Sequence, residues 1–326
     1  MAEYYDLNPN LTTTPSLSGE MKTFYNKRLI DHAEPKLRHL QFGTAYPIPK
    51  NGGKTIEFRK YSPLAKAMNP IEEGVTPEGG TLSMSVITAN IAQYGYYVTI
   101  SDMLEYTAID NNLVQATKLL GGQMGRTLDS LCRDELCAGT NVIYAAKADG
   151  TEVASRKGLT ADCKLTVDTI YDAVAELKAM NAEPIEGGDY VAIAHPYVLN
   201  DLMKSDGWQD AHKYADPEAI FDGEVGRIAG CRFVDSSEAK IWKDDTCPDD
   251  LAVHAVLVLA DNAFAKTEVE GLGAEMIVHD KTQEGGPLEQ RSTAGWKATH
   301  VTKRLTEEYM VRIECCSGRS ATVAAN

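Results

Sequence analysis

The sequence predicts an α+β fold, and three observations lead to this class. Residues 55–61 and 81–100 alternate apolar and polar side chains with the period of a β-strand. Between residues 110 and 138, apolar side chains recur every three or four positions, which is the period of an α-helix. Helical patterns and short buried-strand patterns then follow one another between residues 160 and 245, as in an α/β unit.

Composition limits the classes of function. The chain has 326 residues and a formal net charge of −15. This charge disfavours tight binding to a nucleic acid, because such binding is driven by Lys and Arg. No stretch approaches the roughly 18 consecutive apolar residues of a membrane span, and the N-terminus lacks the basic start and apolar middle of a signal peptide. We therefore expect a protein that is made and kept in the cytosol, without membrane contact.

The first segment, residues 1–44, is predicted to be an arm. Residues 1–20 hold little to bury and would become ordered only against another surface. Residues 21–30 place apolar side chains at helical spacing, which predicts one short amphipathic helix that ends before Pro35.

Residues 45–100 are predicted to form an extended β-hairpin loop. Three prolines and three glycines lie between the strand at 55–61 and the extended stretch that begins at residue 81. An irregular segment of that length is unusual in a compact domain unless it has a function. Two long strands with charged faces and no helix between them bury too little apolar surface to be stable alone. The hairpin must therefore lie on another surface, for which a neighbouring copy is the simplest candidate.

The turn before the first strand, Gly52-Gly53-Lys54-Thr55, looks like the end of a phosphate-binding loop. Such a loop needs a first glycine five positions before the glycine that precedes the lysine, and a helix that starts at the lysine. Ile48 occupies the first of these positions, and a strand pattern follows in place of a helix. We therefore predict no nucleotide site at this turn.

The long helix at 110–138 contains two adjacent glycines, Gly121 and Gly122. Each glycine costs roughly 1 kcal/mol relative to alanine inside a helix. Two interpretations are open: the pair permits close packing against another backbone, or it marks a place where the helix must bend.

No arrangement of residues predicts a catalytic, cofactor or metal site. The seven cysteines form no C-x-x-C pair and are interpreted as reduced thiols, and the seven histidines lack the spacing of metal ligands. The acidic pairs Glu72-Glu73, Asp244-Asp245 and Asp249-Asp250 lie in loop-like sequence, where solvated turns explain them better than paired catalytic carboxylates.

His195 is the one candidate for chemistry, because it ends a predicted buried strand at a helix start, where α/β proteins place ligands. Pro196 follows it, so a plain N-cap role explains the position equally well. An α/β enzyme with a site near His195 is thus the alternative function. A tail-fibre or adhesin subunit is a third class, but the long β repeats that are typical of it are missing.

Seven segments carry a resemblance to a known family. They are IPKNGGKTIEFRKYSPL (48–64), EGVTPEGG (73–80), QYGYYVTISDML (93–104), AGTNVIYA (138–145), HPYVLNDL (195–202), GEVGRIAGCRFV (223–234) and GPLEQRSTAGWKATHV (286–301). Together they closely resemble the major capsid proteins of tailed bacteriophages, in particular the branch typified by short-tailed lytic phages with large internal polymerases. The resemblance spans roughly residues 20 to 301 in the same order and is absent from residues 1–20 and from the tail after Cys315.

The resemblance implies the Hong Kong-type phage capsid fold and a division of the chain into five parts. These are an N-terminal arm (1–44), an extended loop over a neighbouring subunit (45–100), a peripheral domain with a long spine helix (101–150), an axial α/β domain (151–249), and strands that return to the peripheral domain with the C-terminus (250–326).

The resemblance also implies a function: self-assembly into hexamers and pentamers of an icosahedral shell that encloses double-stranded DNA without sequence-specific binding. It implies scaffold, portal and decoration proteins as partners, and a virion that is assembled in the host bacterial cytoplasm. The expected intersubunit contacts are charged residues of the extended loop, Lys54, Glu57, Arg59, Lys60, Glu72 and Glu73. Gly121 and Gly122 are the expected hinge of the spine helix.

Overall fold

The computed structural model describes residues 38–50, 52–68, 70, 73–74, 76, 79–107, 112–185, 188–205, 207–208, 224–269, 273–284 and 288–326. The predicted helix at 21–30 and Glu72 lie outside these residues. The chain divides into two compact units. Within the described residues, the first holds 93–129 and 273–299, and the second holds 38–92, 130–269 and 300–326.

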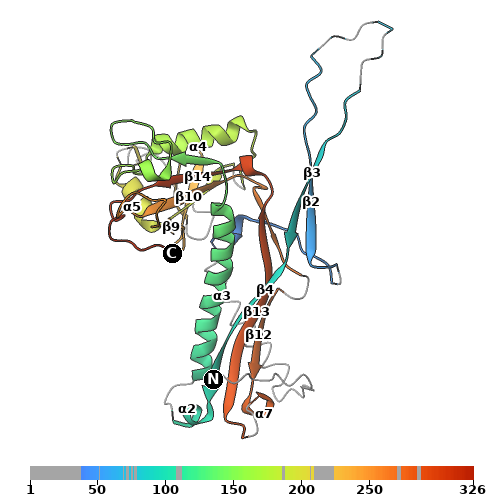
Figure 1. Cartoon of the computed structure of the whole chain (residues 1–326), viewed down its shortest axis with the longest axis vertical. Coiled ribbons are helices and arrows are strands. Elements are labelled where there is room, and N and C mark those ends of the chain that lie inside the picture. The colour runs from blue at the N-terminus through green and yellow to red at the C-terminus, as the bar shows by residue number, and fades with distance from the viewer. Residues whose placement is uncertain are drawn as a thin grey trace. The chain divides into compact units, whose positions relative to one another are not determined.

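The first unit is built from a sheet and a helix. Its strands are β4 (Ala92–Ser101), β12 (Ala274–His279) and the first part of β13 (Arg291–Arg304), with the short helices α2 (Asp102–Thr107) and α7 (Lys281–Glu284) (Figure 1). β12 pairs antiparallel with β13, from Ala274 opposite Ala298 to His279 opposite Thr293. β4 also pairs with β13.

The predicted long helix is confirmed as α3 (Asn112–Cys137), which begins in the first unit and ends in the second. Its buried apolar positions recur at four-residue spacing, as expected for one helix face: Ala116, Leu120, Met124, Leu128, Cys132 and Leu136. Trp296 of β13 donates its indole N–H to the side-chain oxygen of Gln123 at 3.0 Å. Within the first unit this contact fixes the helix on the sheet.

Two glycines permit the close approach of β4 to β13. A Cβ atom on Gly95 would lie 2.7 Å from the carbonyl oxygen of Trp296, and one on Gly295 would lie 2.8 Å from the Cβ of Tyr97. Real side chains do not tolerate such contacts. The close packing of β4 on β13 therefore explains the glycine in the Gly-Trp-Lys-Ala segment at 295–298.

The second unit contains a seven-stranded sheet. Its order is β5 (Val142–Tyr144), β14 (Met310–Cys315), β10 (Val253–Leu259), β6 (Tyr190–Ala194), β8 (Cys231–Asp235) and β7 (Glu224–Ile228), and β9 (Ile241–Trp242) pairs with β10. Every residue of β6, β10 and β14 is buried. The short turns η3 (Arg156–Gly158) and η4 (Glu307–Tyr309) also belong to this unit.

Two predicted helices of this unit are confirmed. Thr166 caps α4 (Val167–Ala179) by accepting the backbone N–H of Thr169 on its hydroxyl. Pro196 occupies the first turn of α5 (Pro196–Met203), where its missing N–H costs nothing.

The predicted division at residue 250 does not match the sheet. β10 and β14 were assigned to strands that return to the peripheral domain, but β10 pairs with β6 and β14 pairs with β10, inside the α/β sheet. The physical reason is burial: β10 is apolar except for His254, and the two charges of β14, Arg312 and Glu314, pair with each other, so both strands fit the buried centre of the sheet.

The second unit also holds a smaller sheet and a separate hairpin. β1 (Thr44–Ala45) pairs with β11 (Phe264–Thr267), which pairs in turn with the last residues of β13. β2 (Thr55–Tyr61) and β3 (Met84–Asn90) pair with each other, and η2 (Leu40–Phe42) precedes them (Figure 1). The paired strands of the hairpin end at Asn90, and β4, the second extended stretch expected within residues 45–100, pairs with β13.

In the part of the chain that the structure describes, no helix combines the length and apolarity needed to cross a membrane. The same residues contain no group of three or more His, Cys, Asp or Glu side chains arranged to hold a metal ion.

Candidate assembly surfaces

The β2–β3 hairpin presents two different faces. The strands are antiparallel, with Thr55 opposite Asn90 and Tyr61 opposite Met84. Because alternate residues of a strand point to opposite faces, Ile56 and Phe58 share one face with their partners Ala89 and Ile87. These four side chains are half-buried or buried, and the ring of Phe58 meets the edge of Tyr46 at a centroid distance of 5.3 Å. This face is held by the chain's own residues.

The opposite face of the hairpin is exposed. Glu57, Arg59 and Tyr61 lie on it, and the cross-strand partners of Arg59 and Tyr61 are Val86 and Met84. The exposed fractions are 62% for Tyr61 and 46% for both Val86 and Met84. The face therefore combines two opposite charges with a strip of exposed apolar side chains, a composition typical of a protein–protein contact.

The structure does not place all the predicted contact residues on one face of the hairpin. Lys54, Glu57, Arg59 and Glu73 are exposed, and Glu57 and Arg59 share the outer face. Lys60 lies on the other face, and its ammonium group is 3.4 Å from a carboxylate oxygen of Glu308 in the same chain. Lys60 therefore already has an ion-pair partner, Glu308, within its own subunit.

The sequence reasoning missed the apolar part of this surface. The exposed apolar side chains of the hairpin and its loop are Tyr61, Leu64, Met68, Leu82, Met84 and Val86. The signal was available, because Val86 and Met84 alternate with serines along β3 and cannot all be buried in an isolated two-stranded sheet.

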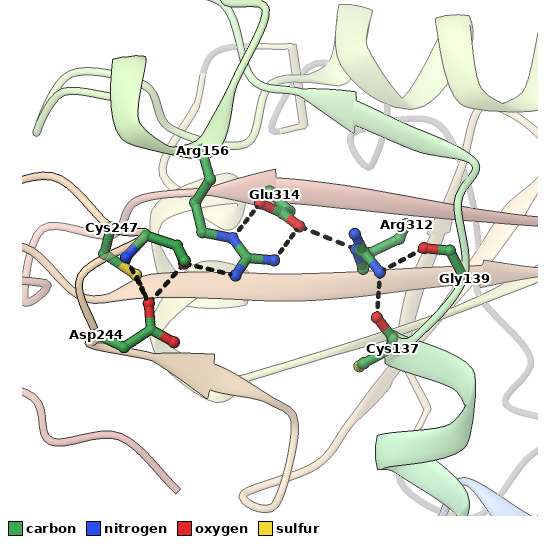
Figure 2. Close-up of polar contacts among 8 residues, drawn as sticks. Cys137, Gly139, Arg156, Asp244, Cys247, Arg312 and Glu314 are labelled. Atoms are coloured by element: carbon green, nitrogen blue, oxygen red, sulfur yellow. Dashed lines mark hydrogen bonds and ion pairs between the residues drawn. The ribbon is translucent and has the colours of Figure 1, made fainter.

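A buried ionic network holds the C-terminal end of α3 to the seven-stranded sheet (Figure 2). Glu314 of β14 is fully buried and accepts two hydrogen bonds of 2.7 Å from the guanidinium of Arg156 and one of 3.0 Å from Arg312. Arg312 donates in turn to the carbonyl oxygens of Cys137 and Gly139. A cation at this place stabilises the helix, because the last carbonyls of a helix carry negative partial charge.

Three side chains contact the guanidinium of Arg156. Its guanidinium lies 3.9 Å from the ring centroid of Trp242 and donates to the hydroxyl of Thr246 at 3.0 Å, in addition to Glu314. The hydrogen bond to Glu314 raises the pKa of Arg156 above its ordinary value, and burial acts in the opposite direction. The group is therefore a permanent cation that neutralises the buried carboxylate.

The last turns of α3 make further ion pairs within the second unit. Asp134 pairs with Lys240 at 3.2 Å, Glu135 with Lys303 at 3.0 Å, and Arg133 donates to the carbonyl of Glu238 at 2.7 Å. The end of α3 is therefore attached to this unit by several polar contacts.

Gly121 and Gly122 lie inside α3, and the helix is continuous through them. Gly121 is buried, whereas a Cβ atom on Gly122 would meet nothing within 4 Å. Close packing against another backbone thus does not explain Gly122. The hinge interpretation stays a prediction.

The region around His195 does not have the geometry of an active site. His195 Nδ1 accepts the backbone N–H of Tyr197 at 3.2 Å, which is an N-cap role. Behind it, Ser317 Oγ lies 3.0 Å from His254 Nε2, but Ser317 is 3% exposed and His254 is fully buried. Burial lowers the pKa of His254 to about 4, with a further lowering by His195. Ser317 is therefore inaccessible to a substrate, and His254 is too weak a base to activate its hydroxyl.

The cysteines are core residues. All seven are free and buried. Burial raises the pKa of Cys137 to about 12 and that of Cys316 to about 11, so these thiols stay protonated and unreactive at neutral pH.

Comparisons with known proteins agree with an exposed hairpin surface suited to contact with other subunits. The sequence profile of the family described as phage capsid protein matches residues 85–313. No curated protein matches the chain. Three similar solved structures are the capsids of Ralstonia phage GP4 and of the cyanophages Pam1 and P-SCSP1u.

The capsid of Ralstonia phage GP4 has a TM-score of 0.68 and 15% identity, and the match covers 97% of this chain and 98% of that chain. The cyanophage Pam1 capsid has a TM-score of 0.64 and 14% identity, with 97% and 100% covered. The capsid of cyanophage P-SCSP1u has a TM-score of 0.63 and 15% identity, with 85% and 87% covered. At such identities the likeness establishes the fold, which is the predicted α+β capsid fold. Because the family profile covers well over half of the sequence, the chain belongs to the phage capsid protein family.

Proposed function

We propose that this chain is the major capsid protein of a tailed phage, and that its copies form hexamers and pentamers of an icosahedral shell around double-stranded DNA. The observation that carries the proposal is the outer face of the β2–β3 hairpin. This face exposes Glu57, Arg59, Tyr61, Met84 and Val86, although the chain elsewhere buries a large apolar core.

The hairpin is an economical contact element. Its inner face is fixed by Phe58 against Tyr46 and by Lys60 to Glu308, so the strands have a defined surface before any partner arrives. A preformed surface loses less conformational freedom on binding than a disordered one. In the proposed shell the outer face lies on a neighbouring copy, and the exposed residues Lys54 and Glu73 are further contacts.

The charge of the chain suits a container for DNA. A net charge of −15 gives little attraction to phosphates, so packaged DNA would meet few strong binding sites on the subunit. In this proposal, scaffold, portal and decoration proteins complete the particle, and assembly takes place in the host cytoplasm.

Reversing the charge of Arg59 tests the role of the hairpin. We expect Arg59→Glu to lower the yield of shells at least tenfold, measured by sedimentation and negative-stain imaging. Melting of the isolated subunit should change little, because a substitution at an exposed position usually alters stability by less than about 0.5 kcal/mol. Lys157→Glu, an equal change of charge at an exposed position of the α/β sheet unit, is the control. Normal shells from Arg59→Glu would contradict the proposed contact.

The hinge proposal for Gly121 and Gly122 is tested separately. Replacing both with alanine should stiffen α3, because alanine favours the helix by about 1 kcal/mol per position. We expect precursor shells of the double variant to be malformed or to contain a straight helix, as seen by imaging. Gly122→Ala alone, where the added methyl group meets nothing within 4 Å, shows whether packing is disturbed. Normal precursors with a bent helix in the double variant would rule the hinge out.

A further inference from the structure

One edge of β4 has no partner among the described strands. β12 pairs with β13 from residue 293 to residue 298 along one side. Gly95 and Tyr97 of β4 approach the same part of β13, at Gly295 and Trp296. A strand has only two hydrogen-bonding edges, so β4 occupies the other side of β13, and its own second edge faces away from the sheet.

This strand carries no charge or proline that would protect a free edge. Soluble proteins cover an edge strand or place charges, prolines or bulges on it, because unpaired N–H and C=O groups invite another strand. No charged residue or proline occurs from Gly79 to Ser101, in a chain of which 24% is charged. β4 is ten residues long and lies wholly inside this uncharged segment.

The side chains along β4 are also exposed. The exposed fractions are 55% for Tyr96 and 69% for Tyr97, and α2 continues the pattern with Met103 at 66%. Large apolar side chains gathered on one element mark an interaction site on a soluble protein. The side chains and the main chain of β4 therefore both indicate a missing partner.

The charge of the chain indicates what that partner is. Copies of a subunit with a net charge of −15 repel one another, so contacts between copies are least costly where charges are absent. A nucleic acid would need Lys or Arg on the strand, and β4 has neither. A second copy of the chain meets both conditions.

We propose that the free edge of β4 pairs, through main-chain hydrogen bonds, with an extended strand of a second copy of this chain. The inference rests on the proposed role as a shell subunit and adds a contact distinct from the hairpin. The exposed tyrosines then lie on either side of the added strand and cover it.

A density map of assembled particles is the direct test. The expected result is main chain of a second copy running along β4 at a spacing of about 4.8 Å. Shells in which β4 faces solvent, or meets only side chains, overturn the β4 contact and leave the proposed function intact. A chain that forms no shells at all overturns both.

Amide hydrogen exchange gives an independent readout without a variant. Amides of β4 that point away from β13 should exchange at least 100-fold more slowly in particles than in dissociated subunits, whereas those already bonded to β13 should change less. Unchanged exchange in intact particles overturns the proposal.

A variant that introduces a charge on β4 tests the proposal, and the same substitution elsewhere serves as its control. Tyr96→Lys should lower the yield of shells at least tenfold in a subunit that still melts cooperatively. Tyr171→Lys on α4 is the control, since Tyr171 is also 55% exposed but belongs to the second unit. Normal assembly of Tyr96→Lys contradicts the proposal, and if this variant fails to fold, the exchange measurement on the unmodified protein decides.

Discussion

Glu314→Gln is expected to lower the free energy of unfolding of the second unit by about 3 to 5 kcal/mol, the usual effect of breaking a buried ion pair. Glu314 is fully buried and balances the guanidinium groups of Arg156 and Arg312. The amide has nearly the same shape as the carboxylate, so the loss would come from charge and hydrogen bonding rather than from a cavity. Two cations would be left in a poorly hydrated site.

The effect of this substitution should extend to α3. Arg312 donates to the carbonyls of Cys137 and Gly139 while Glu314 holds its other nitrogen. Without the carboxylate, Arg312 loses the group that orients it, and the last turn of α3 should exchange its amide hydrogens faster. Urea unfolding followed by tryptophan fluorescence measures the stability, and Trp242 lies directly against Arg156.

Glu308→Gln is the control for this prediction. Glu308 pairs with Lys60 at 3.4 Å, but both side chains are about half exposed. Exposed pairs contribute about 0 to 1 kcal/mol, so this change of the same chemical kind should hardly affect unfolding. Equal effects of the two substitutions would show that the burial of Glu314 does not determine the size of the loss in stability.

Local elements of this fold could be predicted because their signals lie within one stretch of sequence. The helix α3 follows from uninterrupted apolar spacing between Leu113 and Leu136, and the start of α4 follows from Thr166 as N-cap. The strand pattern at 55–61 likewise gave β2 with its correct bounds. In each case neighbouring residues alone decide the structure.

Sheet order could not be predicted in the same way. β10 is apolar except for His254, so its sequence indicates burial but not which strand lies beside it. Arg312 and Glu314 give β14 the alternating pattern of a half-exposed strand, although every residue of it is buried. The different partners of β3 and β4 could not be predicted either, because both strands are uncharged and extended. Only pairing with β13 separates β4 from the hairpin, and that partner lies far along the chain.

The candidate surface was predicted in part for a similar reason. Exposure of Glu57 and Arg59 follows from strand alternation. The partner of Lys60 does not, because Glu308 is brought to it only by the tertiary fold. The network of Arg156, Glu314 and Arg312 joins three places in the sequence, and no local pattern distinguishes these residues from surface charges.

Acidification from pH 7 to pH 5 is expected to destabilise the chain through two buried histidines. Burial lowers the pKa of His254 to about 4 and, with Lys266, that of His300 to about 4. The ordinary value in an unfolded chain is about 6.5. Between these values the unfolded state binds more protons than the folded state, so stability falls as the pH falls. The loss begins near pH 6.5 and is complete below about pH 4.

The size of the effect follows from the same shift. Each histidine should remove about 2 kcal/mol between pH 7 and pH 5, a large part of the 5 to 15 kcal/mol that holds a typical domain together. The protonated form of His254 would also face His195, whose ring centroid is 5.3 Å away, whereas Asp201 favours the charge.

His254→Gln separates this histidine from other acid effects. Glutamine can keep a hydrogen bond to Ser317 but cannot take up a proton, so the variant should lose about 2 kcal/mol less than the unmodified protein between pH 7 and pH 5. Urea unfolding at both pH values measures the difference. His279→Gln, the same substitution at a half-exposed position of β12, is the control for the exchange of histidine for glutamine. An unchanged pH dependence in His254→Gln would mean that His254 takes up its proton over the same pH range in the folded and the unfolded chain, and that the acidic group nearby offsets its burial.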